Sequence, residues 1–240
     1  MNKRAILSLH PFGGVAVALA FTSLFPVSSY AATSEQARSV LPTFERIDID
    51  LVGDFALHMG ERHGYRITAE KKVIEAITFY VRNGELQVRS ARNFKTDQPV
   101  KIEITASALS RVRLGGSETV TSDVPALPAF EIRNDGSGTF RSNNVAAAKV
   151  TVLSAGSGEI ELAGKADQVK VVASGSGDAM LDHLVSNQVR VESSGSATVH
   201  VHAQRTLDAT VTGAGTVAYR GNPVVTQSVT GGGDVTKMAR

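Results

Sequence analysis

The chain has 240 residues with no cysteine and no tryptophan, and its 25 basic and 23 acidic side chains give a formal net charge of +2. The missing cysteines exclude disulfide bonds, thiolate metal ligands and a cysteine nucleophile. Basic side chains form no stripe interleaved with aromatic residues, so nucleic-acid binding lacks its main electrostatic support.

Residues 1–31 have the three regions of a secretory signal peptide. Lys3 and Arg4 form a positive start, an apolar run follows over residues 15–25, and small residues precede a cleavage site after Ala31. The alternative is an uncleaved anchor, but the run is shorter than the about 20 residues of a membrane span. Cleavage leaves 25 − 2 = 23 basic against 23 acidic residues, a formal charge of zero. We therefore expect an exported protein, periplasmic or secreted, without stable membrane insertion after signal removal.

Residues 32–43 are expected to form an N-terminal linker, and residues 44–110 predict a β region that begins or caps the repeat that follows. Ile47, Ile49 and Leu51 alternate with other residues, a pattern typical of half-buried strands. Asn83-Gly84 separates two further alternating runs and is a strong hairpin signal.

Residues 111–240 return seven times to a glycine-centred turn, and its first glycines are 20, 20, 19, 20, 18 and 18 residues apart. Such a period is the signature of a repeat architecture. The position four residues after the first glycine is apolar in every copy: Val120, Phe140, Ile160, Ala179, Val199, Val217 and Val235. The glycines are interpreted as structural corners, which allow positive φ and close stacking. These turn glycines are Gly116, Gly136, Gly138, Gly156, Gly158, Gly175, Gly177, Gly195, Gly213, Gly215, Gly231 and Gly233.

These features predict an all-β fold, a single-stranded parallel β-helix or β-solenoid with about 20 residues per coil, right-handed in preference to left-handed. A coil of about 20 residues has a perimeter of about 66 Å, which fits three short strands joined by three corners. Neighbouring coils would bury apolar faces that a single coil cannot cover. The alternative is an antiparallel sandwich or barrel, in which strands recur about every 8–12 residues.

Two segments and the serial turns resemble a known family. The segments FERIDIDLVGDFALHMG (44–60) and VRNGELQVRS (81–90), followed by the Gly-Ser-Gly turns, are similar to the bacterial head GIN domain family, described as auto-transporter adhesins. The resemblance covers residues 44–235, nearly the whole mature chain. It implies a parallel β-helix exported across the inner membrane. It implies no catalytic set, because the family is known by its fold and repeat.

The sequence contains none of the common catalytic or nucleotide-binding motifs, and it predicts no catalytic, cofactor-binding or metal-binding residues. The Gly-Ser-Gly turns are similar to phosphate loops, but no helix or lysine follows them. The segment Gly231-Gly232-Gly233-Asp234 is similar to a calcium-binding nonapeptide, which needs an aspartate in most repeats. The equivalent column is instead mostly threonine, which indicates a solvated outer ladder: Thr119, Thr139, Glu159, Asp178, Thr198, Thr216 and Asp234.

Glu159 and Asp178 in that column are expected on adjacent coils about 5 Å apart. Two carboxylates at this separation could serve a retaining glycosidase as acid and nucleophile. The simpler interpretation is a pair of solvated side chains, because nothing aromatic nearby offers a platform for a sugar.

His200 and His202 lie two residues apart on an expected strand, so both point to one face. A metal site would need a further ligand, for which Asp182-His183 is the one candidate. The neighbouring valines 199 and 201 take the inward positions of the repeat, which leaves both histidines on the surface.

We therefore expect a non-catalytic binding, adhesion-like or scaffold module of the cell envelope that needs no cofactor. Its partner would be an envelope polysaccharide or protein, and not a nucleic acid. The alternative is a carbohydrate-active enzyme, a glycan hydrolase or lyase, because the fold alone does not decide function. Self-association through an uncapped end of the solenoid is a further expectation.

Overall fold

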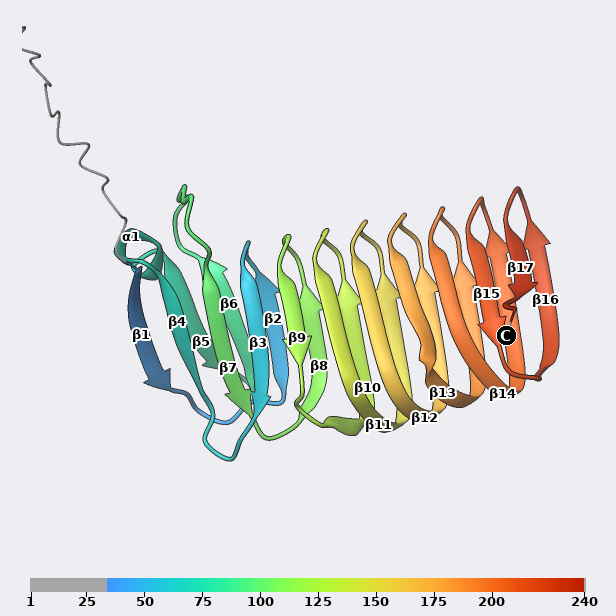
Figure 1. Cartoon of the computed structure of the whole chain (residues 1–240), viewed down its shortest axis with the longest axis horizontal. Coiled ribbons are helices and arrows are strands. Elements are labelled where there is room, and N and C mark those ends of the chain that lie inside the picture. Colours follow the sequence, from blue (N-terminus) through green and yellow to red (C-terminus); the bar gives the residue numbers. More distant parts are fainter. Residues whose placement is uncertain (1–33, 240) are drawn as a thin grey trace, which may run out of the picture. The chain divides into compact units, whose positions relative to one another are not determined.

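The computed structural model describes residues 34–239. They form one 17-stranded sheet, wound into a parallel β-solenoid, and one short helix (Figure 1). This confirms the predicted fold class. The predicted signal peptide and the predicted cleavage site after Ala31 lie outside the described residues.

The C-terminal coils follow one another in chain order (Figure 1). Each of the strands β11–β14 has 15 or 16 residues and runs from one glycine turn to the next. The strands of this part are β10 (Ala126–Asn134), β11 (Thr139–Ser154), β12 (Glu159–Ala173), β13 (Asp178–Ser193), β14 (Thr198–Thr212), β15 (Thr216–Arg220), β16 (Val224–Thr230) and β17 (Asp234–Lys237).

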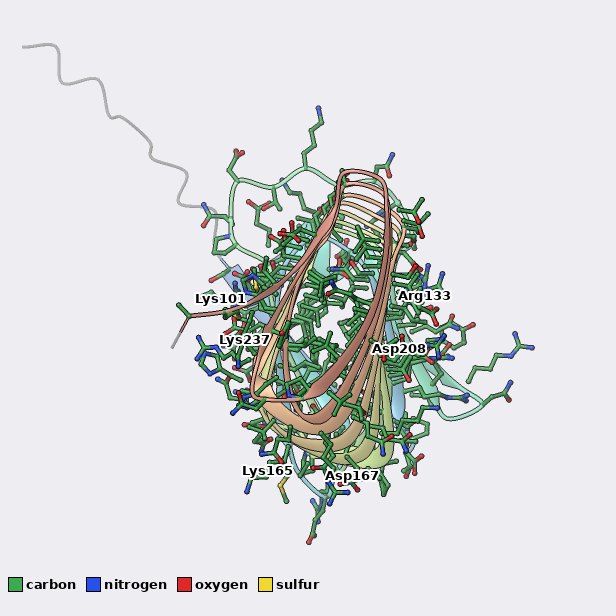
Figure 2. All side chains as sticks on the ribbon, turned by 90° about the vertical axis from the view of Figure 1, so that its right-hand side faces the viewer. Lys101, Arg133, Lys165, Asp167, Asp208 and Lys237 are labelled. Carbon is green, nitrogen blue, oxygen red and sulfur yellow. The ribbon has the colours of Figure 1, made fainter. Side chains whose placement is uncertain are left out.

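Each of these coils has two broad faces, joined by a narrow turn at one edge and a rounded bend at the other (Figure 2). The expectation that each coil has three short strands joined by three corners is therefore wrong. Each of the strands β11–β14 crosses the bend without a turn, and its pairing there shifts register, as between Ser142 and Val145 in β11. A bulge of this kind bends a strand while its pairing continues on both sides.

The two faces are named after their N-terminal strands. The β3 face contains β7, β3 and β9 and the first halves of β11–β14, and it carries Lys101 and Lys237 (Figure 2). The β2 face contains β6, β2, β8 and β10 and the second halves of β11–β14, and it carries Arg133 and Asp208. Lys165 and Asp167 mark the rounded bend.

The N-terminal coils are stacked out of chain order. Strands β2 and β3 pair with β6 and β7 on one side and with β8 and β9 on the other. The coil of residues 46–59 is thus inserted between two coils that come later in the sequence. These strands are β2 (Arg46–Asp50), β3 (Asp54–Met59), β6 (Glu85–Ser90), β7 (Lys101–Ala106), β8 (Leu109–Leu114) and β9 (Thr119–Ser122).

Antiparallel strands lie at the N-terminal end of the stack. β4 pairs with β7, β1 pairs with β4, and β5 pairs with β6. The short helix follows β4 and places Val73 fully inside the core. These elements are β1 (Ser34–Val40), β4 (Gly64–Glu70), α1 (Lys71–Ile74) and β5 (Ile77–Arg82). Among residues 34–239, no helix is long and apolar enough to cross a membrane.

The turn glycines leave room for the backbone of the preceding coil. A Cβ atom on Gly156 would lie 1.8 Å from the carbonyl oxygen of Gly136, and one on Gly175 would lie 2.1 Å from that of Gly156. Positive φ, the other expected reason for glycine, occurs in these turns only at Gly213 and Gly231. Close stacking therefore explains most of the turn glycines.

Candidate binding cleft at the turn edge

A cleft with a volume of about 670 Å³ lies at the turn edge of the N-terminal coils. It separates the long β6–β7 loop from the turns of the two neighbouring coils. Its lining combines apolar side chains with carboxylates, an amide and an ammonium group, as is common in small-molecule sites. The lining residues are Asp50, Leu51, Val52, Ser90, Asn93, Phe94, Lys95, Thr96, Asp97, Gly116 and Ser117.

The cleft exists because the β6–β7 connection is much longer than the other turns. It spans residues 91–100, whereas the glycine turn between β8 and β9 spans residues 115–118 (Figure 1). Ala91 donates to the carbonyl of Ala76, and the carbonyl of Val100 accepts from Asp54, so both ends of the loop are fixed. Phe94 packs against the core from the loop and also lines the cleft.

A fully buried carboxyl group lies directly behind the cleft. Glu118 has no solvent exposure, and neither of its carboxyl oxygens has a hydrogen-bond partner. Its Oε2 approaches Gly116, which lines the cleft. Burial raises the pKa of Glu118 to about 7, and the charge of Asp50 adds to the rise. The amides of Gly115 and Gly116 act in the opposite direction, without meeting hydrogen-bond geometry.

Glu118 and Asp50 resemble a catalytic acid and base pair in their electrostatics, but a substrate in the cleft cannot reach Glu118. A carboxyl group with a raised pKa beside an ionised one is the arrangement that many glycosidases use. A general acid must, however, come within hydrogen-bond reach of the substrate. Glu118 is sealed beneath the turn, so only Asp50 and Asp97 present carboxylates to a molecule in the cleft.

The predicted carboxylate pair lies far from this cleft in the stack. Glu159 and Asp178 are neighbours in the β12–β13 ladder of the β3 face, as expected from the repeat. Arg141 binds Glu159 at 2.7 Å and Glu161 at 2.8 Å, which makes Glu159 part of a surface ion-pair cluster. Neither Glu159 nor Asp178 lines the cleft.

The two predicted surface histidines have the expected orientation. Val199 and Val201 are buried, while His200 and His202 are partly exposed between them. Asp182 contacts His183 at 3.7 Å and Arg220 at 3.2 Å. No group of three or more histidine or carboxylate side chains within residues 34–239 is arranged to hold a metal ion.

Sequence reasoning missed both the cleft and Glu118. The loop carries no periodic pattern, and the cleft depends on the inserted coil of β2 and β3, which no local signal indicates. Glu118 did have a signal. The other turns carry small residues at its position, namely Gly138, Gly158, Gly177, Ala197, Gly215 and Gly233. An acidic residue in a glycine column indicates a locally different turn.

The stacked parallel coils and the antiparallel strands at their N-terminal end define the class of a parallel β-solenoid. A family model described as "Putative auto-transporter adhesin, head GIN domain" matches residues 43–223. The chain belongs to this family, which confirms the resemblance seen in the sequence. A search of curated proteins finds no match.

Several solved structures share the fold. A "putative adhesin" from Bacteroides fragilis NCTC 9343 has a TM-score of 0.81 and 22% identity, over 86% of this chain and 97% of that chain. A "putative lipid binding protein" from Parabacteroides distasonis ATCC 8503 has a TM-score of 0.67 and 18% identity, over 87% and 98%. A "putative adhesin" from Parabacteroides merdae ATCC 43184 has a TM-score of 0.63 and 19% identity, over 87% and 98%. At these identities the likeness shows the fold alone.

Proposed function

We propose that this chain is an exported, non-catalytic module that binds an envelope polysaccharide through the cleft at its turn edge. The signal-like residues 1–31 and the adhesin description of the family support export. The solenoid supports a binding role, because its stacked turns form one wall of the cleft and the loop that forms the other wall is hydrogen-bonded at both ends.

The cleft is the observation that carries this proposal. Phe94 and Val52 offer apolar surface, while Asp50, Asn93 and Asp97 offer hydrogen-bonding groups beside it. A sugar presents both apolar C–H faces and hydroxyl groups, so a mixed lining of this kind is complementary to it. The partner class is therefore a polysaccharide in preference to a protein segment.

A carbohydrate-active enzyme is the second candidate function. The specific observation in its favour is the raised pKa of Glu118 beside Asp50. The closure of Glu118 from solvent counts against it, since no bound glycan could receive its proton.

Binding can be tested with residues 32–240 on a glycan array and in an envelope polysaccharide pull-down. We expect saturable binding, reduced about tenfold or more by Phe94→Ala, which corresponds to about 1.4 kcal/mol. Tyr80→Ala is the matched control, because Tyr80 is an exposed aromatic residue outside the cleft. Equal loss in both variants, or no loss in either, would contradict the assignment to the cleft.

The same preparation separates binding from catalysis. Prolonged incubation with each bound glycan should release no shorter products. Depolymerisation that disappears in Asp50→Asn, Glu159→Gln or Asp178→Asn would replace the binding proposal with the enzymatic one.

A further inference from the structure

A second hollow of about 460 Å³ lies on the β3 face, where β1, β4, β7 and β3 run side by side near the N-terminal end. Its lining includes three arginines, Arg38, Arg62 and Arg66, together with His58 and Glu103. It is separate from the turn-edge cleft and shares no lining residue with it.

Two of these arginines face each other directly across neighbouring strands. Arg38 on β1 is the register partner of Arg66 on β4. Like charges in opposite positions of an antiparallel pair destabilise the sheet. An anion between the two guanidinium groups would be attracted by both and would offset their mutual repulsion.

The acidic side chains of the hollow do not balance its positive charge. Glu103 pairs with Arg66 at 3.2 Å, and Asp123 pairs with His58 at 3.3 Å. Within residues 34–239, Arg38 and Arg62 form no ion pair. Two of the three guanidinium groups that line the hollow therefore have no carboxylate partner among the described residues, which matches a doubly charged anion.

The walls of the hollow are held in place by a buried histidine. The Nδ1 atom of His63 accepts from the Phe44 amide at 3.2 Å, and its Nε2 atom contacts the Ser107 hydroxyl at 3.1 Å. Burial lowers the pKa of His63, so the ring stays neutral and keeps both bonds. Arg62 precedes this fixed residue in the chain and lines the hollow beside it.

We infer that the hollow binds a phosphate monoester, carried by an envelope glycan or by a lipid headgroup. A phosphate monoester is close to doubly charged at neutral pH, and its oxygens match the planar donor fork of arginine. The hollow is of the size found for small-molecule sites, about 300–1,000 Å³, so it admits the sugar or glycerol that bears the phosphate.

Isothermal titration with the mature chain tests this site, with inorganic phosphate, a sugar 6-phosphate and phosphatidic acid vesicles as probes. We expect binding of the sugar phosphate or of the vesicles, weakened at least tenfold in Arg38→Gln and in Arg62→Gln. Arg205→Gln removes another exposed arginine, which lies outside the hollow, and should bind as the wild type does. Binding of the sugar phosphate alone assigns a glycan source, and binding of the vesicles but not of phosphatidylcholine vesicles assigns a lipid source.

A thermal melt distinguishes a lost site from a damaged fold. Without phosphate, Arg38→Gln should melt at or above the wild-type temperature, because it removes the repulsion with Arg66. Phosphate should raise the melting temperature of the wild type and leave that of Arg38→Gln unchanged. Absence of binding by every phosphate probe, or equal weakening in Arg205→Gln, would overturn the inference. None of these outcomes depends on Phe94, so this site and the cleft can fail separately.

Discussion

At Glu118 a carboxyl group occupies a position where the other glycine turns of the repeat carry glycine or alanine. The following coil makes room for it, because a Cβ atom on Gly138 would lie 3.3 Å from the Glu118 carboxyl carbon. Since the group is buried without a hydrogen-bond partner, the folded chain disfavours its charged form.

The raised pKa of Glu118 predicts a dependence of stability on pH. Its folded pKa of about 7 exceeds the ordinary glutamate pKa of 4.5, so between these pH values the folded state binds more protons than the unfolded state. The free energy of unfolding should therefore fall as the pH rises from about 4.5 to 7, by on the order of 3 kcal/mol. Glu118→Gln should remove this loss and be the more stable protein at pH 8, measured by urea unfolding at pH 5 and pH 8.

His63 changes the free energy of unfolding with pH in the direction opposite to Glu118. The wild type must therefore be compared with Glu118→Gln. The lowered pKa of His63 means that stability is lost as the pH falls below 6.5, where the unfolded histidine takes up a proton first. His63 is present in both proteins, so the difference between them isolates Glu118. An unchanged difference between pH 5 and pH 8 would show that Glu118 is not buried in its acidic form.

The backbone of each glycine turn packs directly on the turn of the preceding coil. The amide of Ser157 donates to the carbonyl of Gly136 at 3.0 Å, so the ladder continues through the turn itself. Turns that are hydrogen-bonded to each other this closely leave no space for a Cβ atom between them.

Gly156→Ala should consequently destabilise the solenoid by about 3 kcal/mol, because the new methyl group would overlap the Gly136 carbonyl and push two coils apart. Gly232→Ala is the matched control in the last turn, where an added Cβ atom meets nothing within 4 Å. Its effect should stay below about 0.5 kcal/mol. Thermal and urea unfolding of the two variants test this prediction, and similar losses in both would show that close stacking is not what requires glycine in these turns.

For the whole molecule, the repeat predicted the features that follow from local sequence, namely which residues face the core and how successive coils pair. The inward column from Val120 to Val217 is buried, and its members pair in register from coil to coil. The sequence could not predict that β2 and β3 insert between β7 and β9, since that order is decided by pairing across tens of residues. The cleft follows from this insertion and was missed with it.

The two ends of the stack differ in how they are closed. Antiparallel strands and Val73 cover the core at the N-terminal end. The last coil is open: β16 is almost entirely exposed, carries no charged residue, and has Val224 and Val229 at 74% and 41% exposure. An uncharged edge strand with free backbone groups favours pairing with another chain.

Self-association through this open coil is therefore the prediction for the intact molecule. Two copies that meet end to end could pair their β16 edges and bury Val229 of each, in a symmetric contact that closes both ends. Sedimentation velocity of the mature chain should show a concentration-dependent dimer, and Val229→Lys should shift it to the monomer by placing a charge in the contact. Thr78→Lys adds the same charge to the β5 edge at the capped end and should leave the dimer intact. A wild-type chain that stays monomeric at high micromolar concentration would mean that strand twist or the neighbouring Asp234 and Lys237 already protect the edge, because nothing else of the described chain covers it.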